Sequence, residues 1–156
     1  MNRRGFSMIE MLLVMVIIGL VGMIGLPRMR DTVDQANVRA AKSQLANMVS
    51  TARAVAVSRG CPATFNLTTG AAGTVWITAC QTSNVGAGGA TETVGQVEPL
   101  AARYGVTITS TLNSFIFDRR GLRTDFNLTT IRVQSTRNAA RIDSIQVNQV
   151  GKVIVR

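Results

Sequence analysis

Few side chains in this sequence could carry chemistry, and their types exclude most kinds of active site. Histidine, the commonest general base and a frequent metal ligand, is absent from the 156 residues, which include only two cysteines. The remaining residues form no Ser/His/Asp, Cys/His or paired-carboxylate arrangement, and a metal site would need more ligands than two cysteines. We therefore expect no enzymatic activity, no cofactor and no metal.

A single carboxylate, Glu10, has the most unusual setting. It stands in a run from Phe6 to Leu26 that is otherwise apolar, apart from one serine and three glycines. As a helix the run would span roughly 30 Å, about the thickness of the hydrocarbon core of a bilayer. A carboxylate inside a membrane costs about 2.5 to 3.5 kcal/mol and needs a partner. No Lys or Arg follows within the next turns, so we expect the partner on another molecule.

The flanks of the apolar run indicate export of the chain that follows it. Arg3 and Arg4 precede the run and predict an N-terminus on the cytoplasmic side of the membrane. A cleaved signal peptide begins in a similar way. However, the run closes in Gly25-Leu26-Pro27 and has no small-residue cleavage site, which favours a retained helix.

The residues Gly5-Phe6-Ser7-Met8-Ile9-Glu10 resemble the processing site of type IV pilins and pseudopilins. The resemblance implies that prepilin peptidase cuts after Gly5, that Phe6 is N-methylated, and that Glu10 meets the Phe6 amino group of a neighbouring subunit during assembly. Other pilin or pseudopilin subunits are then partners, as is the inner membrane before assembly. The implied parts are a leader peptide (1–5), a transmembrane and filament-core helix (6–27) and a periplasmic pilin-like domain (28–156).

The helical period continues beyond the apolar run, from Arg28 to Gly60. Apolar residues recur at three- and four-residue steps and predict one buried face: Val38, Ala41, Leu45, Val49, Ala52 and Ala56. Arg59-Gly60 supplies a cation and a glycine stop at the helix end. We expect one long helix, kinked at Pro27. A separate coiled coil fits less well, because the stripe is short and rich in alanine.

The two cysteines flank an expected hairpin, in which the strands 61–67 and 74–80 enclose a turn-rich stretch, 68–73. A register that pairs Phe65 with Trp76 also places Cys61 opposite Cys80. In an oxidising periplasm this pairing predicts a disulfide, with two buried free thiols as the alternative.

The rest of the chain predicts strands and a loop. Residues 81–95 are rich in glycine and threonine and have no period, so we expect a loop there. Strands are expected at 105–110, 114–117, 130–134, 142–147 and 152–155. The fold class is then α+β, a long N-terminal helix packed on an antiparallel β-sheet.

Three later segments, AVAVSRG, SFIFDRRGLR and IQVNQVGKVIVR, resemble the GspH/FimT family of minor pilins and pseudopilins. The resemblance implies a minor pilin that assembles into a type IV pilus, as in the family members linked to DNA uptake. The alternative is a minor pseudopilin of a type II secretion system, which serves protein export.

Charge is the sequence feature that bears on this choice. Residues 103–156 contain nine basic and three acidic residues, a balance of +6, whereas residues 60–102 contain no basic residue and two acidic ones. This concentration favours a polyanion such as DNA, although a basic surface is more commonly a solvated face or a subunit contact. The residues expected to contact DNA are Arg119, Arg120, Arg123, Lys152 and Arg156. The final hairpin departs from the G-R-x-R pattern of DNA-contacting members, because only one basic residue follows Gly151 closely.

Overall fold

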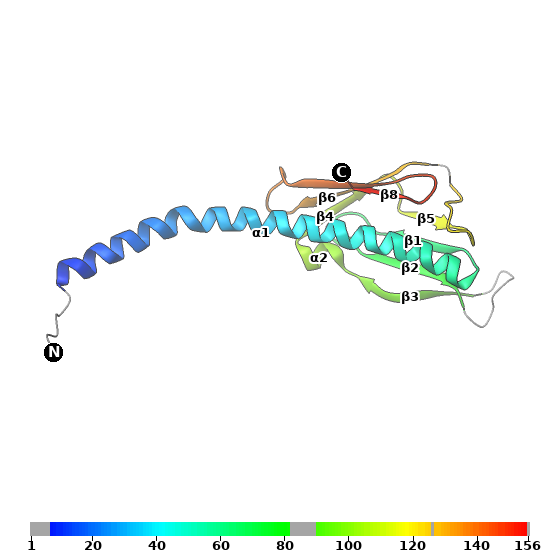
Figure 1. Cartoon of the computed structure of the whole chain (residues 1–156), viewed down its shortest axis with the longest axis horizontal. Helices are drawn as coiled ribbons and strands as arrows, with labels where there is room; N and C mark the ends of the chain where they lie inside the picture. Colours follow the sequence, from blue (N-terminus) through cyan, green and yellow to red (C-terminus); the bar gives the residue numbers. More distant parts are fainter. Residues whose placement is uncertain (1–6, 82–89, 126, 156) are drawn as a thin grey trace. The chain divides into compact units, whose positions relative to one another are not determined.

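The computed structural model describes residues 7–81, 90–125 and 127–155, with the side chains of residues 24–27 and 155 left out. The described chain falls into two compact units, one that ends at Val33 and one that begins at Asp34. The helix α1 (Met8–Arg59) contributes to both units (Figure 1).

The first unit is the apolar part of α1. Its 18-residue window of mean hydropathy 2.6 is long and apolar enough to cross a membrane, and none of that window is buried within the chain. Glu10 lies exposed in the first turn of the helix.

The second unit confirms the predicted buried face of α1. The residues of that face are all buried: Val38, Ala41, Leu45, Val49, Ala52 and Ala56, together with Met48. The helix ends at Arg59, and Gly60 follows with φ 62°, a left-handed conformation that glycine adopts without strain. The predicted continuous helix and its glycine stop are therefore confirmed.

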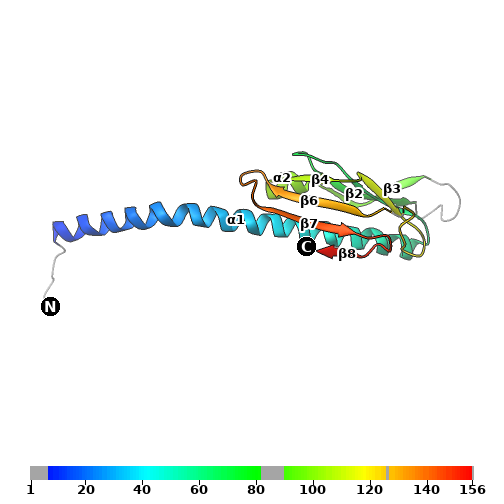
Figure 2. The same cartoon turned by 90° about the horizontal axis from the view of Figure 1, so that it is seen from above.

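Two four-stranded antiparallel sheets follow α1 in this unit (Figures 1 and 2). The first has the order β3 (Thr91–Glu98), β2 (Val75–Cys80), β1 (Ala63–Leu67), β5 (Ser114–Phe117). The second has the order β4 (Val106–Ser110), β6 (Thr129–Ser135), β7 (Ile142–Val147), β8 (Val153–Val155). Buried residues of α1 and of both sheets form one apolar core. The expected α+β class is confirmed, with two sheets in place of one.

Two elements differ from the sequence-based expectation. The strand β3 begins inside the stretch that was expected to be a loop, and the short helix α2 (Leu100–Tyr104) was not expected. The side chains of β3 are mostly exposed, so this edge strand carries little of the apolar alternation that reveals a half-buried strand. A five-residue helix is too short to show a helical period.

The predicted register of the first hairpin is wrong by one residue. Phe65 pairs with Ile77 and not with Trp76, which lies opposite Asn66. The observed register places Ile77 on the buried face beside Phe65, whereas Trp76 lies half-buried on the other face. Because a shift by one residue moves every side chain to the opposite face, burial of the aliphatic residues of β2 decides the pairing.

The predicted disulfide is present despite this register. Cys61 and Cys80 are bonded, with Cα atoms 6.3 Å apart. Cys61 lies before the start of β1, so the strand register does not fix its position. Arg59 fastens the helix end beside them, since its Nη1 donates to the Cys80 carbonyl at 2.8 Å and to Glu92 Oε1 at 2.6 Å.

Candidate basic surface

A tight turn follows β5 and carries the first two predicted DNA-contacting residues. The Gly121 N–H donates to the Asp118 carbonyl at 2.9 Å, and the Asp118 N–H donates to the Leu122 carbonyl at 2.8 Å. The Asp118 carboxylate accepts from the N–H groups of Arg120 and Leu122, at 2.9 and 2.8 Å. The carboxylate is thus occupied in shaping the turn, and Arg119 and Arg120 are exposed on it.

The glycine of this turn lies against α1. Gly121 has φ +74°, and a Cβ added there would come within 2.9 Å of Val57 Cγ2 and 3.1 Å of Arg53 Cγ. Only a residue without a side chain allows this approach of the turn to the helix. The contact places the Arg53 side chain next to the turn.

The turn between β7 and β8 packs against the turn that follows β5. Gly151 has φ +75°, and a Cβ there would lie 2.6 Å from Phe117 Cε1 and 3.4 Å from the Gly121 carbonyl oxygen. Asn148 shapes this second turn, because its Oδ1 accepts from the Lys152 N–H at 2.7 Å. The three segments that resemble the GspH/FimT family therefore meet at one surface.

A groove of about 600 Å³ opens where these segments meet. It lies between α1 and the start of β8, and its lining is mostly apolar. The lining residues are Ser50, Arg53, Ala54, Val57, Ser58, Gly151, Lys152 and Val153.

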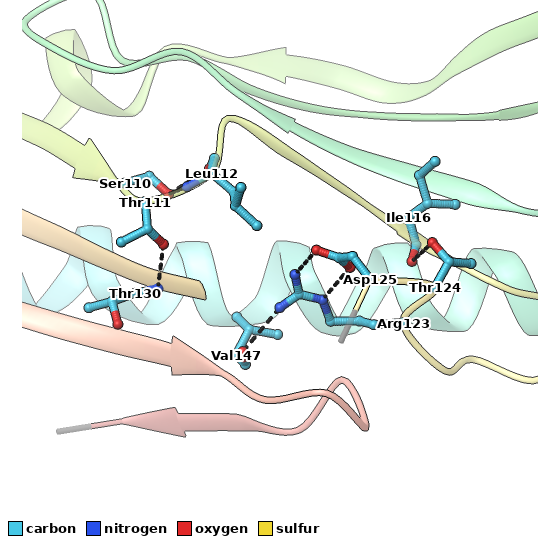
Figure 3. A network of polar contacts seen from close by, with 9 residues as sticks. All are labelled: Ser110, Thr111, Leu112, Ile116, Arg123, Thr124, Asp125, Thr130 and Val147. Carbon is cyan, nitrogen blue, oxygen red and sulfur yellow. Dashed lines mark hydrogen bonds and ion pairs between the residues drawn. The ribbon is translucent and has the colours of Figure 1, made fainter. Parts of the chain in front are cut away.

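Arg123 does not share this surface, which corrects one of the predicted DNA contacts. Its side chain is fully buried, with Nε 3.0 Å from Asp125 Oδ1 and Nη2 2.5 Å from Asp125 Oδ2 (Figure 3). Nη1 donates to the Val147 carbonyl at 3.1 Å, and Cζ lies 4.4 Å from the centre of the Phe115 ring. A guanidinium held on three sides in this way is unavailable to a phosphate.

The acidic residues of the second unit are all engaged within it. Five of them form ion pairs: Asp34 with Arg137, Glu92 with Arg59, Glu98 with Arg103, Asp125 with Arg123, and Asp143 with Lys42. The sixth is Asp118, which caps the turn after β5.

Four cations around the two turns form no ion pair with a described residue: Arg53, Arg119, Arg120 and Lys152, here called the basic cluster. Arg53 was not among the DNA-contacting residues expected from the sequence. The sequence feature that could have indicated Arg53 is its position directly before the AVAVSRG segment. Arg156, Gly5 and Phe6 lie outside the described residues, so their predicted roles stay predictions.

A metal site requires several ligating side chains close together. Within this part of the chain, His, Cys, Asp and Glu side chains form no group of three or more that could hold a metal ion. Glu10 has no ion pair with any described residue.

Comparison with known families gives two matches. The model of a family described as "Type II transport protein GspH" matches residues 41–151, and the "Prokaryotic N-terminal methylation motif" matches residues 1–26. No curated protein matches the chain at a significant level.

Two crystal structures of the type IV minor pilin FimU from Pseudomonas aeruginosa strain PAO1 share the fold. The P21 form has TM-score 0.61 and 14% identity, over 80% of this chain and 92% of that chain. The P65 form has TM-score 0.57 and 15% identity, over 76% of this chain and 91% of that chain.

Proposed function

The chain belongs to the GspH family of pilin-like proteins, and on that premise we propose that it is a minor pilin of a type IV pilus that binds DNA through the two exposed arginines of its basic cluster, Arg119 and Arg120. Prepilin peptidase cuts after Gly5 and Phe6 is methylated, which the match of residues 1–26 to the methylation motif supports. The helix holds the subunit in the inner membrane, with its N-terminus in the cytoplasm and residues 28–156 in the periplasm. Glu10 then pairs with the terminal amine of a neighbouring subunit.

The observation that carries the DNA proposal is the basic cluster itself. Every acidic side chain of the second unit already has a partner within that unit. The cations of the cluster are therefore available to pair with an anionic partner outside the chain. Arg119 and Arg120 stand exposed on a turn, where guanidinium groups reach phosphates without entering a groove of the duplex. Such contacts predict binding that does not depend on DNA sequence.

A salt titration tests the proposal. The full chain in detergent is titrated with duplexes of unrelated sequence, and each phosphate contact contributes about −0.9 to the slope of log K against log salt. The Arg119→Ala/Arg120→Ala variant should bind more weakly and flatten the slope by about 2. The matched control is Arg39→Ala/Arg132→Ala, which removes two exposed arginines from other places. A turn variant that binds like the control would refute the proposal.

The second candidate function is that of a minor pseudopilin in type II secretion, which the description of the matching family favours. In that case the basic cluster contacts another protein and DNA binding is absent. Deletion of the gene in its host separates the two candidates, because loss of DNA uptake supports the pilus and loss of protein export supports the secretion system.

A further inference from the structure

The groove between α1 and β8 has a lining suited to a peptide more than to a phosphate backbone. Val57 is 52% exposed, and Ala54 beside it is exposed as well. Val153 completes the apolar part of the lining from the β8 side. Apolar surface of this kind gains nothing from contact with a polyanion, so the exposed arginine turn and the groove are distinct in chemistry.

The strand β8 offers free backbone groups at this groove. The Asn148 N–H donates to the Lys152 carbonyl at 3.1 Å, and Gln146 pairs with Ile154 two residues further along. Because hydrogen-bonded and non-hydrogen-bonded pairs alternate in an antiparallel ladder, the N–H and C=O of Val153 point away from β7. β8 is the last strand in the order of its sheet, so these groups can accept an added strand.

The charges at the groove define the partner further. Arg53 and Lys152 line it and have no ion pair with a described residue. In an extended segment with alternating apolar and acidic side chains, the apolar side chains would contact Val57 and the acidic ones would lie beside Arg53 and Lys152. A second copy of this chain fits poorly, since the acidic side chains of its second unit are already engaged.

We propose that this groove binds an extended acidic segment of a different pilin-like subunit, which adds as a strand beside β8. The inference rests on the proposed assembly of the chain with other subunits. It assigns Val57 and Val153 to the contact surface, and Arg53 and Lys152 to selection of the partner by charge.

Site-specific crosslinking in the native host tests this. Photoreactive p-benzoylphenylalanine replaces Val57 in the full chain, and the crosslinked peptides are sequenced. We expect an adduct with an acidic, extended segment of another pilin-like subunit. Adding Arg53→Gln and Lys152→Gln should lower the adduct yield by about tenfold, because charge pairing selects the segment. The matched charge control, Arg39→Gln with Arg132→Gln, should leave the yield unchanged.

A second variant tests the strand addition separately. Val153→Pro removes the outward N–H without removing a hydrogen bond to β7, and it should also reduce the adduct while the Cys61–Cys80 disulfide stays intact. Three results would overturn the proposal. They are an adduct with a second copy of the chain, an adduct whose yield is unchanged in both variants, and the absence of any adduct in assembled filaments. Glu10→Ala in the same host reports on assembly. If the wild-type chain assembles but forms no adduct, only the proposed binding of a segment in the groove is refuted. If the Glu10→Ala variant assembles normally, the proposed function is refuted.

Discussion

The guanidinium of Arg123 lies over the ring of Phe115, with Cζ 4.4 Å from the ring centre. Asp125 holds the same guanidinium by two hydrogen bonds, and the Val147 carbonyl accepts a third at 3.1 Å. Phe115 belongs to β5 of the first sheet and Val147 to β7 of the second, so Arg123 ties the two sheets together. A residue whose charge suggested a ligand is thus a structural part of the core.

This position predicts a large effect of Arg123→Ala on stability. The change leaves the Asp125 carboxylate and the Val147 carbonyl without their partner and opens a space over Phe115, so the free energy of unfolding should fall by about 3 kcal/mol. Urea denaturation of the full chain in detergent measures this. Arg120→Ala, on the exposed turn nearby, should stay within about 0.5 kcal/mol of wild type. Equal stability of the two variants would contradict the structural role.

Gly151 should not tolerate a side chain. An added Cβ would lie 2.6 Å from Phe117 Cε1, in a backbone conformation with φ +75°. We expect Gly151→Ala to lower the free energy of unfolding by about 2 kcal/mol or more, because steric overlap adds to the cost of the left-handed conformation. The control is Gly60→Ala, where φ is +62° but nothing lies within 4 Å, and the cost should be about 1 kcal/mol. Thermal or urea unfolding that ranks Gly60→Ala as the more damaging change would speak against this packing.

Removal of the disulfide should destabilise the second unit. Cys61 and Cys80 enclose a loop with a sequence separation of 19, and the lost constraint on the unfolded chain is worth about 3 kcal/mol. Cys61→Ser/Cys80→Ser should therefore unfold at lower urea concentration. Non-reducing peptide mapping of the wild-type chain should join the two cysteine peptides. Two alkylatable thiols in the folded protein would rule out the bond.

The sequence predicted the elements whose side chains alternate between inside and outside. The buried face of α1 followed from the recurrence of residues such as Leu45 and Val49, and β5 and β6 carry clear strand patterns. The register of the first hairpin was not predicted, because pairing of the two aromatic residues Phe65 and Trp76 was expected, whereas burial of Ile77 opposite Phe65 decides the register. The edge strand β3 buries too few side chains to show an alternation of apolar and polar residues in the sequence.

The basic surface was predicted only in part, for a related reason. Charge in a sequence does not reveal whether an arginine is exposed, as Arg119 is, or buried against an aromatic ring, as Arg123 is. Arg53 joins the surface through its contact with Gly121, which lies far along the chain and depends on the packing of the turn on α1. Apart from the position of Arg53 directly before the AVAVSRG segment, the sequence carries no local signal of this contact.

Glu10→Ala should separate membrane insertion from assembly. Removal of the carboxylate favours insertion, since a charge in the membrane is costly, but it leaves the amine of a neighbouring subunit unpaired. Immunoblots of sheared filaments and membranes should show the variant at wild-type level in the membrane and reduced about tenfold in the filament. Ser7→Ala, a change in the same apolar run, is the control and should assemble normally.

Intact-mass analysis of the chain from its native host tests the central claim most directly. The pilin-like account predicts a mature chain that begins at Phe6 and carries one added methyl group, with the Cys61–Cys80 disulfide formed. A substitution of Gly5 by a larger residue should leave the leader attached. A mature N-terminus anywhere beyond Leu20 would contradict the account, since it would mark the apolar run as a removed signal peptide.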